Sequence, residues 1–188
     1  AARERIAAAV GCAPADVLFT SGATEADNLA VLGVAEYNAP RGRHLVTART
    51  EHKAVLNACR ELQKRGWQVS WLAPGPSGRI EAPQVADALR ADTTLVSLMH
   101  VNNEIGTVQD IAAIGAVCAA RGVPLHVDAA QSPGKLPLDL AGSQVALASL
   151  SAHKAYGPKG IGALILRGAS GAHLKAQTYG GGQEQGLR

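Results

Sequence analysis

The chain has 188 residues, of which 47% are hydrophobic and only 3% aromatic, and it contains 21 glycines. This length and this aliphatic composition suit one α/β unit with a core of its own. The formal charge of +3 is spread without a run of Lys or Arg, and no apolar segment is long enough to span a membrane, so neither nucleic acid nor a membrane is expected as a partner.

The predicted elements alternate between helices and strands along the whole chain. It opens on the end of a helix that Gly11 closes, and apolar runs of strand length follow. Strands are expected at 17–20, 44–48, 69–73, 94–100, 124–128, 146–151 and 161–167. Helices are expected within TEADNLAVLGVAEY, EHKAVLNACRELQKRG, APQVADALRA and DIAAIGAVCAARG. This order predicts a mostly parallel sheet with helices on both faces and no internal domain boundary.

Polar segments follow five of the predicted strands. They read SGATE, EHK, VNNEIG, DAAQ and SAHK, in chain order. In open α/β sheets, ligands bind beyond the carboxyl ends of the strands. We therefore expect these five segments to form one site.

The first of these segments joins a strand to a helix through Gly22, Ala23 and Thr24. Small residues let a ligand approach the backbone, and the free amides of a helix N-terminus suit one phosphate group. Ser and Thr at this position are more often simple helix caps. The segment matches neither the loop that binds nucleoside triphosphates nor the one that binds dinucleotides.

Asp128 ends a very apolar predicted strand, where a carboxylate is costly without a partner. One possible partner is a metal ion shared with His126 and with His52 or His153. The other is a protonated ring nitrogen. Opposite charges ~4 Å apart attract by about 4 kcal/mol at an effective dielectric constant of about 20, which suffices to keep such a ring protonated at neutral pH.

Two lysines compete for a role in this site. Lys154 directly follows the SAH residues of the last polar segment, and Lys159 lies between Pro158 and Gly160 in the next turn. We interpret Lys159 as part of a structural bend and Lys154 as the reactive amine. A lysine able to form a Schiff base, a phosphate cradle and a buried aspartate together indicate pyridoxal 5′-phosphate.

Five motifs together carry a resemblance to a known family. LFTSGATEADNLA, TEHKAVLNACR, MHVNNEIGTVQDIAAIG, HVDAAQSPGKLPLDL and SAHKAYGPKGIGAL resemble the cysteine desulfurases of the class V aminotransferase family, in the branch for iron-sulfur cluster assembly and nitrogen fixation. The resemblance covers essentially the whole chain. It implies the large domain of the fold type I pyridoxal-phosphate enzymes and a homodimer. It also implies the conversion of L-cysteine to L-alanine, with sulfur passed as persulfide to acceptor or cluster-scaffold proteins.

The resemblance also implies a role for each site residue. Lys154 would carry the cofactor and move protons at the substrate α-carbon, His52 would stack on the ring and act as acid or base, and Asp128 would pair with the ring nitrogen. Gln131 and Asn103 would contact the ring hydroxyl and the substrate side. The phosphate would be held by Ala23, Thr24, Ser151 and His153. No metal ligand is implied.

The chain departs from the family pattern in its cysteines and at its ends. Cys12, Cys59 and Cys118 lack CxxC spacing, and this lack indicates a reducing, cytoplasmic setting. None of the three lies in the SSGSACTS-type loop that carries the family's sulfur-accepting cysteine. Gln185 stands where the family has Arg. We expect residues 1–188 to be a large-domain fragment without the small C-terminal domain, and with little or no desulfurase activity alone.

Two other functions remain open from the sequence. One is another class V enzyme, an aminotransferase or a selenocysteine lyase. The other is a cofactor-binding scaffold without catalysis.

Overall fold

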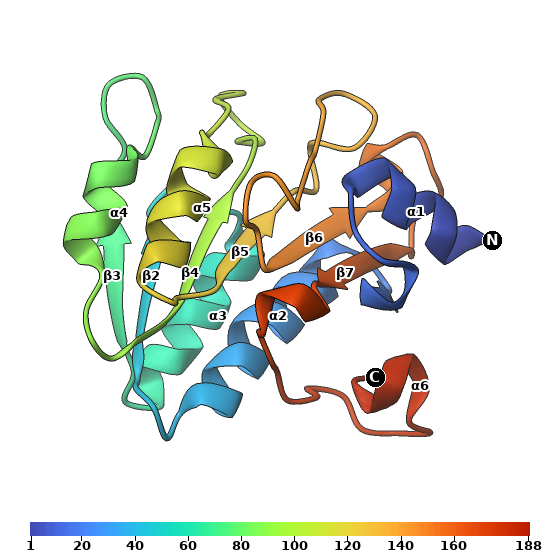
Figure 1. Ribbon diagram of the computed structural model, residues 1–188, viewed down its shortest axis with the longest axis horizontal. Coiled ribbons are helices and arrows are strands. Elements are labelled where there is room, and N and C mark those ends of the chain that lie inside the picture. The colour runs from blue at the N-terminus through green and yellow to red at the C-terminus, as the bar shows by residue number, and fades with distance from the viewer.

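The computed structural model describes residues 1–188 and is built on one seven-stranded sheet (Figure 1). The strands lie in the order β1-β7-β6-β5-β4-β2-β3. Their bounds are β1 Val17–Thr20, β2 His44–Ala48, β3 Gln68–Leu72, β4 Thr93–Met99, β5 Leu125–Asp128, β6 Leu147–Ser151 and β7 Gly162–Leu166. Each lies within one residue of its predicted range at both ends, which confirms the predicted strands.

The sheet is mostly parallel, as predicted, and β7 is its one reversed strand. β2, β3, β4, β5 and β6 pair in parallel, whereas β7 is antiparallel to both β1 and β6. Gly162, at the start of β7, pairs with Thr20 at the end of β1 and with Ser151 at the end of β6. The turn before β7 therefore enters the sheet at the edge where the other strands end.

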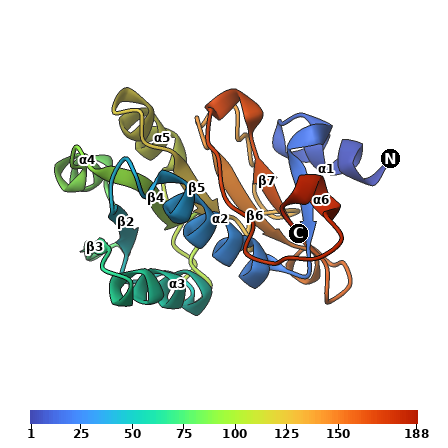
Figure 2. The same ribbon diagram turned by 90° about the horizontal axis from the view of Figure 1, so that it is seen from below.

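Helices cover both faces of the sheet, as predicted (Figure 2). α2 and α3 pack on one face, and α1, α4 and α5 pack on the other. The bounds are α1 Ala2–Val10, α2 Ala23–Asn38, α3 Lys53–Lys64, α4 Ala82–Ala88, α5 Ile111–Ala120 and the short α6 Gln183–Gly186. None of these helices combines the length and the apolar character needed to cross a bilayer.

Burial on both faces explains why the central strands are continuous apolar runs. Leu45 and Val46 are neighbours on β2 and both are fully buried, yet Leu45 belongs to the core under α2 and α3 and Val46 to the core under α4 and α5. A strand side chain alternates between faces, so a strand covered on both sides is buried at every position, and its few polar side chains, such as Thr47 and Ser97, are hydrogen-bonded. Full burial of each such side chain contributes about 1.5–3 kcal/mol.

Local signals set where the helices begin and end. The side chain of Asp110 accepts a hydrogen bond from the Ala113 amide at 3.0 Å, which caps α5. Gly11 ends α1 in the left-handed conformation at φ 69°, which a glycine adopts without the steric cost of a Cβ.

The outer edge of β1 carries side chains in place of another strand. Glu184 accepts a hydrogen bond from the Phe19 amide at 2.9 Å, and Arg3 donates to the carbonyl oxygen of Val17. Arg3 and Glu184 also form an ion pair with an N–O distance of 2.8 Å. The C-terminal segment thereby contacts the N-terminal helix across this edge.

Candidate active site

One cavity at the carboxyl edge of the sheet brings together every residue that the sequence predicted for the site. Its volume is ≈ 480 Å³, within the range of roughly 300–1,000 Å³ usual for small-molecule sites. The predicted residues that line it are Ala23, Thr24, His52, Asn103, Asp128, Gln131, Ser151, His153 and Lys154. They follow the ends of β1, β2, β4, β5 and β6. The five polar segments thus meet at one site.

The end of β6 presents a free amine to this cavity. Ser151 is buried at the end of the strand, and a single 3-10 turn, Ala152–Lys154, follows it. The Ser151 hydroxyl and Nδ1 of His153 are 2.8 Å apart and hydrogen-bonded, which fixes the direction of the turn. Lys154 takes part in none of the ion pairs of the protein, so no carboxylate competes for its amine.

The N-terminus of α2 forms the opposite wall of the cavity. The first amide that bonds within the helix is that of Ala26, to the carbonyl oxygen of Gly22 at 3.2 Å. The amides of Ala23 and Thr24 precede it and have no carbonyl partner inside the helix. Together with the Thr24 hydroxyl they form a set of donors that suits an anion.

Asp128 tests whether a cationic group fits this cavity. The residue is 5% exposed, and its side chain bonds only the Ala130 amide, at 3.0 Å from Oδ1. No Lys, Arg or His nitrogen lies within ion-pair distance of its carboxyl. Burial raises the pKa of Asp128 above its ordinary range, although the Ala130 amide and the charge of His52 lower it. A buried carboxyl that lines a cavity and lacks a protein cation fits a protonated ring nitrogen.

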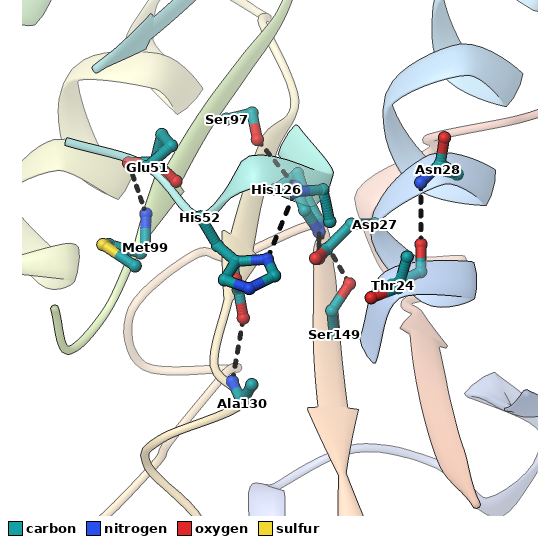
Figure 3. A network of polar contacts seen from close by, with 12 residues as sticks. Thr24, Asp27, Asn28, Glu51, His52, Ser97, Met99, His126, Ala130 and Ser149 are labelled. Atoms are coloured by element: carbon teal, nitrogen blue, oxygen red, sulfur yellow. Dashed lines mark hydrogen bonds and ion pairs between the residues drawn. The ribbon is translucent and has the colours of Figure 1, made fainter. Parts of the chain in front are cut away.

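Two buried hydrogen bonds hold the segment that carries His52. Glu51 accepts from the Met99 amide at 3.0 Å (Figure 3), and the Asn102 side-chain amide donates to the Thr50 carbonyl at 2.9 Å. Both bonds tie the loop after β2 to the end of β4. His52 itself caps α3, with Nδ1 accepting from the Ala54 amide at 3.2 Å, so its position is set from both sides.

A buried polar cluster lies behind the cavity, under α2 (Figure 3). The ring nitrogens of His126 lie 2.9 Å from the hydroxyls of Ser97 and Ser149, and Nε2 lies 3.7 Å from Oδ1 of Asp27. Neither carboxyl oxygen of Asp27 has a hydrogen-bond partner. Burial lowers the pKa of His126 to about 3, and burial together with the charge of Asp128 raises the pKa of Asp27 well above its ordinary range. Burial thus favours the neutral form of both groups.

The metal alternative does not fit this arrangement. It required His126 and Asp128 as ligands of one ion, but both ring nitrogens of His126 are engaged by serine hydroxyls. No group of three His, Cys, Asp or Glu side chains is placed to hold a metal ion.

Lys159 and Glu25, to which the sequence reasoning assigned no role in the site, also line the cavity. Glu25 accepts hydrogen bonds from the Ser21 amide at 2.8 Å and from Arg188 at 2.6 Å. Lys159 was interpreted as part of a bend because it precedes a strand. Placing Lys159 in the site requires the antiparallel direction of β7, and the apolar pattern of a strand does not predict its direction.

A larger cavity, of ≈ 610 Å³, lies at the opposite edge of the sheet. It is lined by residues that precede β5 and β6 and by Arg167, which follows β7. The Arg167 guanidinium bonds the carbonyl oxygens of Leu140 and Val145 at 3.0 and 2.8 Å, so it is engaged by the fold. Since parallel sheets bind ligands at their carboxyl edge, we place the active site in the smaller cavity.

Comparison with known proteins gives consistent relatives. Residues 1–186 match the family described as aminotransferase class-V. Over 187 residues the chain is 55% identical to the cysteine desulfurase IscS of Proteus mirabilis and 56% identical to that of Pectobacterium atrosepticum. Each match covers 100% of this chain and 46% of the relative, so the chain spans about half the length of these relatives.

Solved structures give the same answer for the fold. The structure described as SspA in complex with cysteine matches with a TM-score of 0.95 at 48% identity, over 100% of this chain and 54% of that chain. DndA from Streptomyces lividans matches with a TM-score of 0.92 at 47% identity, again over 100% of this chain and 54% of that one. These neighbours confirm the expected large-domain fold of the pyridoxal-phosphate enzymes, and the chain belongs to the class-V aminotransferase family.

Proposed function

We propose that this chain is the cofactor-binding part of a pyridoxal-phosphate-dependent cysteine desulfurase, which converts L-cysteine to L-alanine and passes the sulfur on as persulfide. The observation that carries the proposal is the single cavity that joins the amine of Lys154, the carboxyl of Asp128 and the donors at the start of α2. The names of the relatives, and the cysteine in the SspA complex, favour this reaction over aminotransfer or selenocysteine cleavage.

Different residues of the cavity would bind different parts of the cofactor. Lys154 would hold it covalently, and the ionised carboxyl of Asp128 would keep its ring nitrogen protonated. The phosphate would be held by Ala23, Thr24, Ser151 and His153, the ring hydroxyl by Gln131 and Asn103, and the ring face by His52. When bound, pyridoxal phosphate supplies an electron sink that stabilises negative charge at the α-carbon of an amino acid.

The chain's own residues would then handle the protons. The Lys154 amine, at the end of the 3-10 turn after β6, forms no ion pair and would accept the α-proton of the substrate and return it. The hydrogen bond of the Ala54 amide occupies Nδ1 of His52, so its other nitrogen, Nε2, is the one free to exchange a proton.

The sulfur-accepting thiol is a separate question. Cys12, Cys59 and Cys118 all lie outside the cavity. Burial raises the pKa of both Cys59 and Cys118 to about 12, so neither supplies a thiolate at neutral pH. We therefore propose that none of the three receives the sulfur. A homodimer, a cytoplasmic location and transfer to sulfur-acceptor or cluster-scaffold proteins complete the proposal, and they rest on the family resemblance.

Borohydride reduction after addition of pyridoxal phosphate tests the proposal. The aldehyde should become fixed to Lys154, which peptide mass spectrometry locates, and the Lys154→Ala variant should take up none at that position. The surface variant Lys64→Ala should label like the parent chain. Labelling spread evenly over the surface lysines, with no preference for Lys154, would refute the proposed function.

A further inference from the structure

A second lysine, Lys159, reaches the same cavity from the turn before β7. The antiparallel direction of β7 brings it there. Because Gly162 pairs with Thr20 and with Ser151, the residues just before Gly162 emerge at the carboxyl edge between the ends of β1 and β6. Lys159 therefore lies among the residues that the site collects, although it precedes a strand.

Close backbone packing joins this turn to the start of α2. A Cβ atom added at Gly162 would lie only 2.6 Å from both Cα and the carbonyl carbon of Gly22. The absence of a side chain at Gly162 thus lets the two backbones touch. Since Gly22 directly precedes the free amides of Ala23 and Thr24, the turn that carries Lys159 enters the sheet beside the start of α2, and Lys159 lines the cavity together with Ala23 and Thr24.

Lys159 is one of the few basic side chains that line the cavity. No arginine lines the cavity, and its only lysines are Lys154 and Lys159. Lys159 forms no ion pair, and the nearby carboxylate of Glu25 is paired with Arg188. If Lys154 is committed to covalent attachment, Lys159 is the one lysine of the lining that is left to bind an anion.

We propose that Lys159 is an anion-binding residue of the site and pairs with the phosphate group of the cofactor. This inference rests on the proposed function. A phosphate ester carries roughly −1.5 to −2 charges at neutral pH, whereas the amides and the Thr24 hydroxyl supply donors without net charge. A lysine ammonium supplies the missing charge as a compact donor. The substrate carboxylate is the other anion with the same chemistry, and the experiment separates the two.

The test compares the affinities of pyridoxal phosphate and of pyridoxal, which lacks the phosphate, by equilibrium dialysis. Lys159→Gln should bind pyridoxal phosphate about tenfold more weakly, as expected for one charge-assisted hydrogen bond. Its affinity for pyridoxal should not change. Lys159→Arg should recover most of the affinity. The control Lys64→Gln, at a residue of α3 that is 77% exposed and outside the cavity, should bind both like the parent chain.

Three results would overturn the inference. The first is equal affinity of the parent chain and Lys159→Gln for pyridoxal phosphate. The second is an equal loss for both ligands, which would mean that the turn is only structural. The third is unchanged cofactor affinity with weaker binding of L-alanine but not of its amide, which would assign Lys159 to the substrate carboxylate. In each of these cases the parent chain still binds at Lys154. A parent chain that fails to do so overturns the proposed function as well.

Discussion

Replacing Gly162 by alanine should disturb both the stability of the protein and its cofactor site. The added methyl carbon would lie 2.6 Å from Cα and C of Gly22 and from the Leu150 carbonyl oxygen. Favourable carbon contacts lie at about 3.5–4.0 Å, so each contact is short by roughly 1 Å. All three are backbone atoms, which cannot rotate away. The strands β1 and β6 must therefore separate locally, or β7 must shift.

The expected cost follows from this overlap. Overpacking of this kind costs roughly 1–3 kcal/mol of unfolding free energy. For a chain of this size each kcal/mol lowers the melting temperature by about 2–4 °C, so a fall of about 2–12 °C is expected. Because the shift starts at Gly22, the affinity for pyridoxal phosphate should fall as well.

Thermal unfolding and equilibrium dialysis of two further variants separate these effects. Gly115→Ala drives a methyl carbon into the Ser143 carbonyl oxygen, away from the cavity, so it should lower stability with little specific loss of cofactor affinity. Gly180→Ala meets no atom within 4 Å and should be close to neutral. If Gly162→Ala melts like the parent chain and binds pyridoxal phosphate equally well, the close approach of β7 to the start of α2 is refuted.

Two further predictions concern buried titratable groups. The raised pKa of Asp27 means that the native state binds its proton more tightly than the unfolded state does. Its contribution to stability therefore falls by up to about 1.4 kcal/mol per pH unit as the pH rises from ~3.9 toward the native pKa. Asp27→Asn should remove this slope, so urea unfolding should show the variant gaining on the parent chain as the pH rises above ~3.9; a pH-independent difference would contradict this. Cys59 and Cys118, with pKa values of about 12, should resist a disulfide-exchange thiol reagent at neutral pH until the chain unfolds. Mass spectrometry should find the half-buried Cys12 modified first, and modification of all three at equal rates in the native protein would show that the two helical thiols are accessible.

The central strands β2, β4, β5 and β6 could be predicted from sequence because each is buried along its whole length. An apolar run of four to seven residues, as in β2 or β4, then stands out against the polar loops. The gathering of polar segments at one edge follows from the parallel order alone, and this is why the sequence predicts Lys154 and Asp128 in one site.

The remaining features depend on long-range geometry that no local pattern records. The direction of β7 is set by its pairing with β1, far away in sequence, and this direction decides that Lys159 joins the site. The contact of Asp27 with His126 arises because α2 crosses above β5. In the sequence, Asp27 occurs in a helix whose pattern of polar and apolar residues does not show which face is buried. The burial of this aspartate could not be inferred.

The side chains on the free edge of β1 limit how the sheet can grow. A further strand added there would need the amide of Phe19 and the carbonyl of Val17 as ladder partners, but Glu184 and Arg3 already bond them. Any edge-to-edge association would first have to break the ion pair between these two side chains, and would leave two charges without partners. The contact between Arg3 and Glu184 thus protects the edge of β1 from aggregation through strand addition.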